Sequence, residues 1–255
     1  MTRSTATIAY YVQVEALRSG LPWLAGGCAI GALGLAGFLS QVAIIESTQL
    51  LASVAGALLR ACAVFLIATQ VVASIAREQN DKGLELALAL PLSRHTWYLG
   101  KLLGFACAGT LLAAVFAAPL LCWAAPANVA AWGLSLAAEL VVVAAAALFF
   151  ASALTQAAAA IAATLGFYLL SRALPAIQAI AAGPLSGDTS GAHAARWTVD
   201  ALALLLPRLD VVTRGDWLLY GTPPAAELAP AVGGLAVYLV LLVAAGLFDL
   251  SRRNL

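Results

Sequence analysis

Charge is scarce in this sequence: 10% of its 255 residues are Asp, Glu, Lys or Arg, whereas 63% are hydrophobic. A water-soluble domain of this length would not have enough polar side chains to cover its surface. The scarcity of charge therefore excludes a soluble domain and predicts an integral membrane protein. The formal net charge of +1 also lacks the strongly basic balance of nucleic-acid binders, so no nucleic-acid partner is expected.

Metal and redox ligands are also few. The two histidines, His95 and His193, lie outside the long apolar runs, which excludes a haem held by two histidines within the bilayer. Methionine occurs once, at position 1, so a path of thioether ligands is absent and no metal site is predicted. The cysteines lie inside apolar runs without CxxC or Cys/His spacing, so we expect small buried residues, neither a disulfide framework nor a zinc site: Cys28, Cys62, Cys107 and Cys122.

Signatures of catalysis are missing as well. The apolar runs contain no nucleophile with a base, no paired Asp and no HExxH. A GxxxxGK[ST] phosphate loop is absent, because the one Gly-Lys pair, Gly100-Lys101, lacks the glycine five residues before Gly100. We therefore expect no enzyme activity, no ATP binding and no cofactor in this chain.

What the sequence has in abundance is apolar runs. Six of them reach the roughly 20 residues that an α-helix needs to cross a bilayer, at about 22–45, 50–76, 99–124, 130–154, 157–182 and 230–249. An even number of spans puts both termini on one side, and the Lys and Arg residues concentrate in the tails and after the second run, which predicts cytoplasmic termini. We therefore predict an all-α, multi-pass protein of the inner (cytoplasmic) membrane, with residues 1–255 as a single transmembrane domain.

Residues 6–20 precede the first run and are amphipathic. Their pattern places apolar side chains on one side of a helical wheel: Tyr10, Tyr11, Val14 and Leu17. The pattern predicts a short helix in the cytoplasmic interface, ended by Gly20 and Pro22. A frayed N-terminus is the alternative.

The connection at 183–229 is longer than structureless loops in compact proteins usually are. The segment "ARWTVDALALLLP" has apolar residues at helical spacing, and Trp217 and Tyr220 are of the kind that favours a membrane surface. We expect one or two short helices on the outer face, lying on or dipping into the outer leaflet. Such a face leaves open a partner on the outer side.

One polar stretch, "REQNDKGLELALALPLSRHTWYLGK", joins the second and third runs at 77–101. Asn80, Asp81 and Gly83 break regular structure, "GLELALAL" resumes it, and Pro91 ends it again. This pattern predicts a short cytoplasmic helix held between two long ones. From these residues alone, an ordinary solvated loop with positive-inside charge remains the alternative.

The same stretch resembles the "E...GtlE.llalPvsR....GK" motif of ABC-2 type permeases, the membrane subunits of type V-like ABC exporters. The residues that carry the resemblance are Glu78, Gly83, Leu84, Glu85, Leu90, Pro91, Ser93, Arg94, Gly100 and Lys101. In addition, "VEALRSG" is similar to the family's amphipathic elbow helix, and "LFDLSRRNL" resembles its cytoplasmic terminus. The segment Asn80-Asp81-Lys82 departs from the more basic run that is common there.

The resemblance implies that the chain is the permease subunit of an exporter of unidentified substrate. Arg77 to about Leu90 would form a coupling helix, within a coupling segment at 77–97, that docks on a separate ATPase subunit carrying ATP and Mg. The coupling residues that it implies are Glu78, Gly83, Glu85, Pro91 and Arg94, with Glu85 and Arg94 as charged contacts.

Permeases of this family work as pairs, so the resemblance also implies a second copy of the chain, as a homodimer. The first run offers "GGCAIGALGLAG", in which Gly27 and Gly31 are four residues apart. Small residues let helices approach closely, either at a dimer seam or within one subunit.

Two other functions stay open: a secondary transporter and a non-transporting membrane assembly subunit. A secondary transporter would be marked by inverted repeats with broken helices near the bilayer midplane. The halves of this sequence show no matching hydropathy, because the connection at 183–229 has no counterpart on the other side.

Three ionisable residues lie inside the predicted spans, namely Arg60, Glu139 and Arg172. Counted at 1.5 Å per residue, Arg60 lies about 15 Å and Glu139 about 13 Å from the outer ends of their spans, with Arg172 nearer the surface. A lone charge near mid-bilayer costs about 2.5–3.5 kcal/mol, so such residues usually turn inward and find partners. We expect Glu139 to pair with Arg60, and Arg172 to join them or line the outer mouth, as a static clamp or an outer gate.

Overall fold

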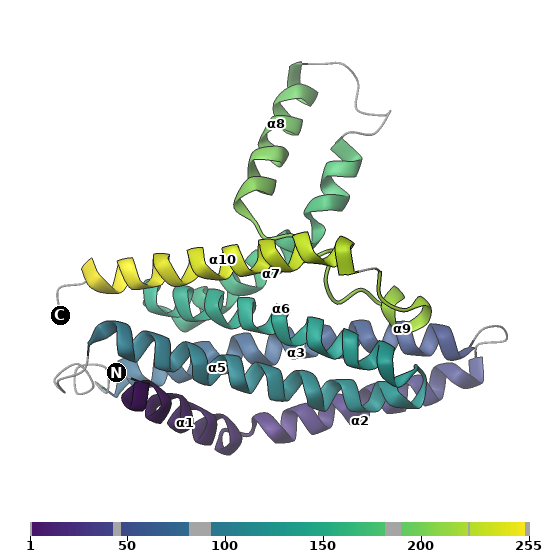
Figure 1. The fold of residues 1–255 in the computed structure, drawn as a ribbon, viewed down its shortest axis with the longest axis horizontal. Helices are drawn as coiled ribbons and strands as arrows, with labels where there is room; N and C mark the ends of the chain where they lie inside the picture. The colour runs from purple at the N-terminus through teal and green to yellow at the C-terminus, as the bar shows by residue number, and fades with distance from the viewer. Residues whose placement is uncertain (1, 43–46, 82–92, 182–189, 224, 253–255) are drawn as a thin grey trace.

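The computed structural model describes residues 2–42, 47–81, 93–181, 190–223 and 225–252, and within these ranges the protein contains helices and no strand (Figure 1). The helices are α1 (Thr2–Arg18), α2 (Leu21–Val42), α3 (Ser47–Asn80), α5 (Arg94–Ala117), the 3₁₀ helix η1 (Ala118–Cys122), α6 (Pro126–Ala153), α7 (Ala157–Ala181), α8 (Ser190–Leu205), α9 (Asp216–Tyr220) and α10 (Ala225–Arg252).

Six of these helices are long and apolar enough to cross a membrane. They contain the segments Leu21–Ser40, Leu51–Asn80, Arg94–Cys122, Pro126–Ala153, Ala157–Ala181 and Leu228–Arg252. The six predicted spans are therefore confirmed in number and, to within a few residues, in position. The chain is a multi-pass membrane protein.

The long helices lie side by side along one axis, with α6 in their midst (Figure 1). Helix α6 packs against α3, α5, α7 and α10, and its segment Val142–Leu148 is almost entirely buried. Four successive alanines in that segment, at 144–147, let the neighbouring helices approach closely. The first residues of α1 and the last of α10 lie at one end of the bundle, here called the terminal end, and α9 lies at the other, the far end (Figure 1).

Helix α1 packs along α5 at the terminal end (Figure 1). Val12 is buried against Gly104, and Ile8 lies against Gly100, so two glycines four residues apart provide the close approach. The apolar face predicted for this segment, with Tyr10 and Leu17, is exposed on the outside of the bundle. The sequence thus predicted a helix and its outward face, but not the second face that α5 covers.

Replacing Gly104 by Leu is expected to push α1 away from α5. A Cβ at this position would lie 2.7 Å from Val12 Cγ1, and overpacking of this kind costs about 1–3 kcal/mol. Thermal unfolding of the purified protein measures the loss. The matched control is Gly166→Leu on α7, an exposed position where a Cβ meets nothing within 4 Å, so an equal loss in both variants would contradict the packing of α1.

The cysteines are not the buried residues that their apolar surroundings suggested. Cys107 and Cys122 are exposed, and Cys28 and Cys62 are partly exposed. The reason is that the outer faces of membrane-spanning helices are as apolar as the core, so an apolar run does not identify the buried side of a helix.

Helix α7 is part of the bundle as far as about Leu174, its last buried residue. Pro175 lies inside the helix and cannot donate the usual backbone hydrogen bond, which favours a bend. The last turns of α7 and the neighbouring α8 project sideways from the bundle (Figure 1). The described residues of the connection predicted at 183–229 include α8 and α9 before α10 begins at Ala225, in agreement with the one or two short helices expected there.

Candidate functional site

A layer of charged side chains crosses the middle of the bundle. Arg60 comes from α3, Glu139 from α6 and Arg172 from α7. Arg60 and Glu139 each lie about 20 Å along their helices from the far-end starts at Ser47 and Pro126. The side chain of Glu139 is completely buried, so its charge depends on protein partners.

The partner of Glu139 is Arg172. One guanidinium nitrogen of Arg172 lies 3.0 Å from Glu139 Oε1. Arg60 instead donates a hydrogen bond of 2.8 Å to the carbonyl of Thr213. The structure therefore brings the three predicted residues into one layer but corrects the predicted pairing of Glu139 with Arg60. Depth alone could not decide between two arginines, because pairing also depends on how each helix is rotated and where α7 leaves the bundle.

A loop between α8 and α9, residues 206–215, enters the bundle at this layer. Leu209 and Thr213 are completely buried, and Val212 nearly so. The arginines hold the backbone of this loop: Arg172 donates to the carbonyls of Leu209 (3.0 Å) and Thr213 (3.2 Å), and Arg60 also donates to Thr213. Non-helical backbone at membrane depth is tolerated only when its polar groups are satisfied in this way.

The loop is followed by α9, which packs between α3 and α6 at the far end. Leu218 is buried beside Gly56 of α3 and close to Trp132 of α6. The side-chain amide of Asn128 donates a hydrogen bond of 3.5 Å to the Leu218 carbonyl. The loop and α9 together occupy the space between α3, α6 and α7 on the far-end side of the charged layer. We call them the plug (206–220).

The closed arrangement has features of a strained, incompletely satisfied site. Thr213 has a backbone φ of +53°, a left-handed conformation that is uncommon for a β-branched residue. Within the described part of the chain, Glu139 Oε2, Arg60 Nε and Thr213 Oγ1 are buried without a hydrogen bond of good geometry, although the side chain of Thr213 lies close enough to interact with the Glu139 carboxylate. Tyr168 of α7 also lies beside Glu139. The two arginines can hold the plug in the charged layer through their hydrogen bonds to its carbonyls. If the plug moved, the polar groups of the layer could bind other partners.

The sequence predicted a short helix near Trp217 and Tyr220, but not the buried loop 206–215 of the plug, although a signal for it exists. The segment "LLLPRLDVVTRGDWLLYG" mixes apolar residues with Pro207, Gly215 and two Arg-x-Asp sequences. An apolar segment too short for a span is more typical of a re-entrant or interfacial piece. Its carbonyl groups, which are the atoms that the arginines bind, leave no trace in the side-chain pattern.

A second polar region lies at the terminal end, where the predicted coupling residues fall. Glu78, at the end of α3, forms an ion pair with Lys101 of α5, whose side chain is almost fully buried. Arg94, the first residue of α5, donates a hydrogen bond of 2.9 Å to the carbonyl of Leu250 in α10. Three further predicted coupling residues, Gly83, Glu85 and Pro91, lie outside the described residues.

Helix α1 is tied into this region by residues that the sequence analysis did not single out. Glu15 accepts hydrogen bonds from Arg77 (2.8 Å) and from Ser74 (3.0 Å). Ser19 donates to Gln70, also on α3 (2.8 Å). Helices α1, α3, α5 and α10 are therefore joined by side-chain contacts at the terminal end, and we call these contacts the terminal network.

The glycines of α2 are not covered by the residues that the structure describes. A Cβ added at any of them would meet no atom within 4 Å: Gly27, Gly31, Gly34 and Gly37. These glycines could have packed against another helix of the same subunit, but no described residue packs against them. The face that they form is open to a partner.

Comparison of this chain with protein-family models and with curated proteins finds no match. What the fold and the site define is a class: a helical multi-pass membrane protein with a buried charged layer whose arginines bind the backbone of the plug.

Proposed function

We propose that the chain is the permease subunit of an ABC exporter, driven by a separate ATPase subunit that binds at the terminal end. The observation on which this proposal rests is that α3 connects the two polar regions. This single helix contains Arg77 and Glu78 of the terminal network and Arg60 of the charged layer. From Glu78 to Arg60 the helix rises about 27 Å, so a push at one position displaces the other.

The terminal network is suited to receive that push. The Glu78–Lys101 pair and the Arg94–Leu250 hydrogen bond lie on the two sides of residues 82–92, within the segment whose sequence resembles the coupling segment of ABC-2 permeases. Because α3 and α5 are fastened here to each other, to α1 and to α10, a docked subunit would move them as a unit. We propose cytoplasmic termini and ATPase contacts at Glu85 and Arg94.

The charged layer would then act as the outer gate. A displacement of α3 pulls the Arg60 guanidinium away from the Thr213 carbonyl, which leaves that carbonyl with Arg172 alone. Loss of one hydrogen bond with a charged donor costs about 1.5–3 kcal/mol, which shifts the ratio of open to closed plug by about 10- to 150-fold toward the open state. Energy from ATP in the partner subunit would supply this displacement.

A second copy of the chain fits the uncovered glycine face of α2. Close helix contacts in membranes use faces of small residues, and no described residue of this chain covers the face at Gly27, Gly31, Gly34 and Gly37. We therefore propose that the exporter contains two permease copies, with a pathway between or beside their bundles.

Reversal of charge at Glu85 tests the coupling. The Glu85→Arg variant is expected to insert and fold like the wild type but to lose several-fold in the ATPase activity that copurifies with the tagged chain, because rim charges govern association. The control is Asp200→Arg, the same reversal at an exposed residue of α8, away from the terminal end. Unchanged ATPase recovery in Glu85→Arg, or equal loss in both variants, would contradict the proposed contact.

A further inference from the structure

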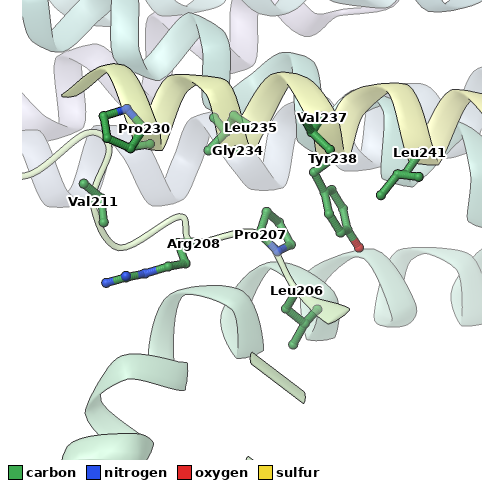
Figure 2. Close-up of a pocket in the computed structure, with 11 residues that line it drawn as sticks. Leu206, Pro207, Arg208, Val211, Pro230, Gly234, Leu235, Val237, Tyr238 and Leu241 are labelled. Atoms are coloured by element: carbon green, nitrogen blue, oxygen red, sulfur yellow. The ribbon is translucent and has the colours of Figure 1, made fainter. Parts of the chain in front are cut away.

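A groove of about 480 Å³ runs between the first half of α10 and the first residues of the plug (Figure 2). Most of its wall is apolar, with Pro207 and Val211 on the loop side and Val237 and Leu241 on α10. Tyr238, whose ring is stacked on Phe167 of α7 at a centroid distance of 5.8 Å, also lines it. The stacked pair gives this part of the groove a fixed wall.

One charged residue, Arg208, lines the groove, and it is placed at one end. Figure 2 shows its side chain extending toward the end where Pro230 and Val211 lie, while Tyr238 and Leu241 lie toward the other end. The side chain is 70% exposed, and the ion pair that the described residues give it, with Asp210, is long at 3.7 Å. A guanidinium group has five N–H donors, so most of its hydrogen-bonding capacity is directed outward.

This distribution defines the chemistry of an occupant. From Pro230 to Leu241 the groove follows α10 for about 16 Å, a length that suits a hydrocarbon chain. Arg208 lies at one end of a groove with an apolar wall. The molecule that complements such a groove has an anionic group at one end and an apolar chain attached to it. Arginine binds phosphate groups through paired hydrogen bonds, which makes a phosphate head the complementary anion.

We propose that this groove binds an anionic bilayer phospholipid, with its phosphate on Arg208 and one acyl chain lying along α10 toward Tyr238 and Leu241. A neighbouring groove provides the internal comparison. It has about 550 Å³, lies between α6, α9 and α10, and shares Leu235 with the first. Among the residues that the structure describes, its lining contains Ser135 and Thr222 but no charged residue that could select an anionic head.

Photocrosslinking tests the assignment and requires no ATPase partner, so it is independent of the proposed export. The protein is placed in phosphatidylcholine vesicles with a trace of phosphatidylglycerol that has a photoreactive group near the end of one acyl chain. Crosslinks are expected on the α10 segment that contains Tyr238 and Leu241. A phosphatidylcholine analogue with the same chain should label this segment about tenfold less.

Two pairs of variants separate selective binding from ordinary lipid contact. Arg208→Gln should lower labelling of the segment by phosphatidylglycerol about tenfold, whereas Arg214→Gln should not, although Arg214 forms a similar pair with Asp216. Gly234→Leu should fill the groove and block labelling. Gly233→Leu should leave the groove intact, because of the two glycines Gly234 alone lines it. Neither leucine should disturb the fold itself, because a Cβ at either position meets nothing within 4 Å.

Several outcomes would overturn the proposal. Equal labelling by the two head groups in the wild type, or full labelling in Arg208→Gln, would mean that the segment contacts bulk lipid without selection. If the probe fails to label while a photoreactive residue at Tyr238 crosslinks two copies of the chain, the groove is an interface between subunits.

Discussion

Glu139→Ala is expected to lower the stability of the protein by about 3–5 kcal/mol, which is the usual result of removing one partner from a buried ion pair. Glu139 is completely buried, and its loss leaves the positive charges of Arg172 and Arg60 in the bundle without the carboxylate. For a chain of this size the loss corresponds to a fall of about 10 °C in Tm. Thermal unfolding in detergent and the yield of inserted protein measure it.

The matched control is Glu15→Ala in the terminal network. Glu15 also pairs with an arginine, Arg77, at 2.8 Å, but the two side chains are 34% and 52% exposed. Exposed pairs contribute at most about 1 kcal/mol, so this variant should stay close to the wild type. If Glu139→Ala were no less stable than Glu15→Ala, the charged layer would have no structural importance and the proposed gate would fail with it.

Removal of both Glu139 and Arg172 side chains distinguishes the contribution of the ion pair to stability from the contribution of the hydrogen bonds that Arg172 donates to the plug. In Glu139→Leu with Arg172→Leu the unpaired charge is gone, and apolar side chains often replace a buried pair at little cost. The carbonyl of Leu209, however, loses its arginine donor. The double variant should therefore recover part of the stability lost by either single change, and losses that simply add would contradict the pairing.

The parts of this fold that could be predicted from sequence are those set by local composition. Runs of apolar residues determine the spans, and all six were found because a bilayer requires a minimum helix length. The three charges were found for the same reason, since an ionisable residue within a span is conspicuous. Neither inference requires knowledge of which helices touch.

The parts that could not be predicted depend on contacts between distant segments. Arg172 replaces Arg60 as the partner of Glu139 because α7 bends out of the bundle, which changes the depth counted from its predicted end. The plug depends on backbone carbonyls at Leu209 and Thr213, and a carbonyl is the same for every residue type. Glycine patterns were equally ambiguous: Gly104 of α5 lies in a tight helix contact, whereas Gly31 of α2 lies in none.

A disulfide between the plug and α3 is expected to stop the transport cycle. The variant combines Ser53→Cys with Gly215→Cys in a background without the four native cysteines. A Cβ at Gly215 would lie 3.8 Å from the Cβ of Ser53, which is the average separation in natural disulfides, and the φ of −61° at Gly215 accepts any residue. Mild oxidation should therefore form the bond readily, and failure to form it would contradict the position of the plug itself.

The functional consequence is measured in vesicles that contain the assembled complex. If the plug must leave the charged layer in each cycle, oxidation should lower ATP turnover and transport at least tenfold, and a reductant should restore both, because the bond ties residues 53 and 215 together across the gate. The single variants Ser53→Cys and Gly215→Cys, treated with the same oxidant, should keep their activity. A complex that is fully crosslinked and still turns over at the wild-type rate would show that the plug is a fixed part of the bundle, and the ion pair between Glu139 and Arg172 would then be a static clamp.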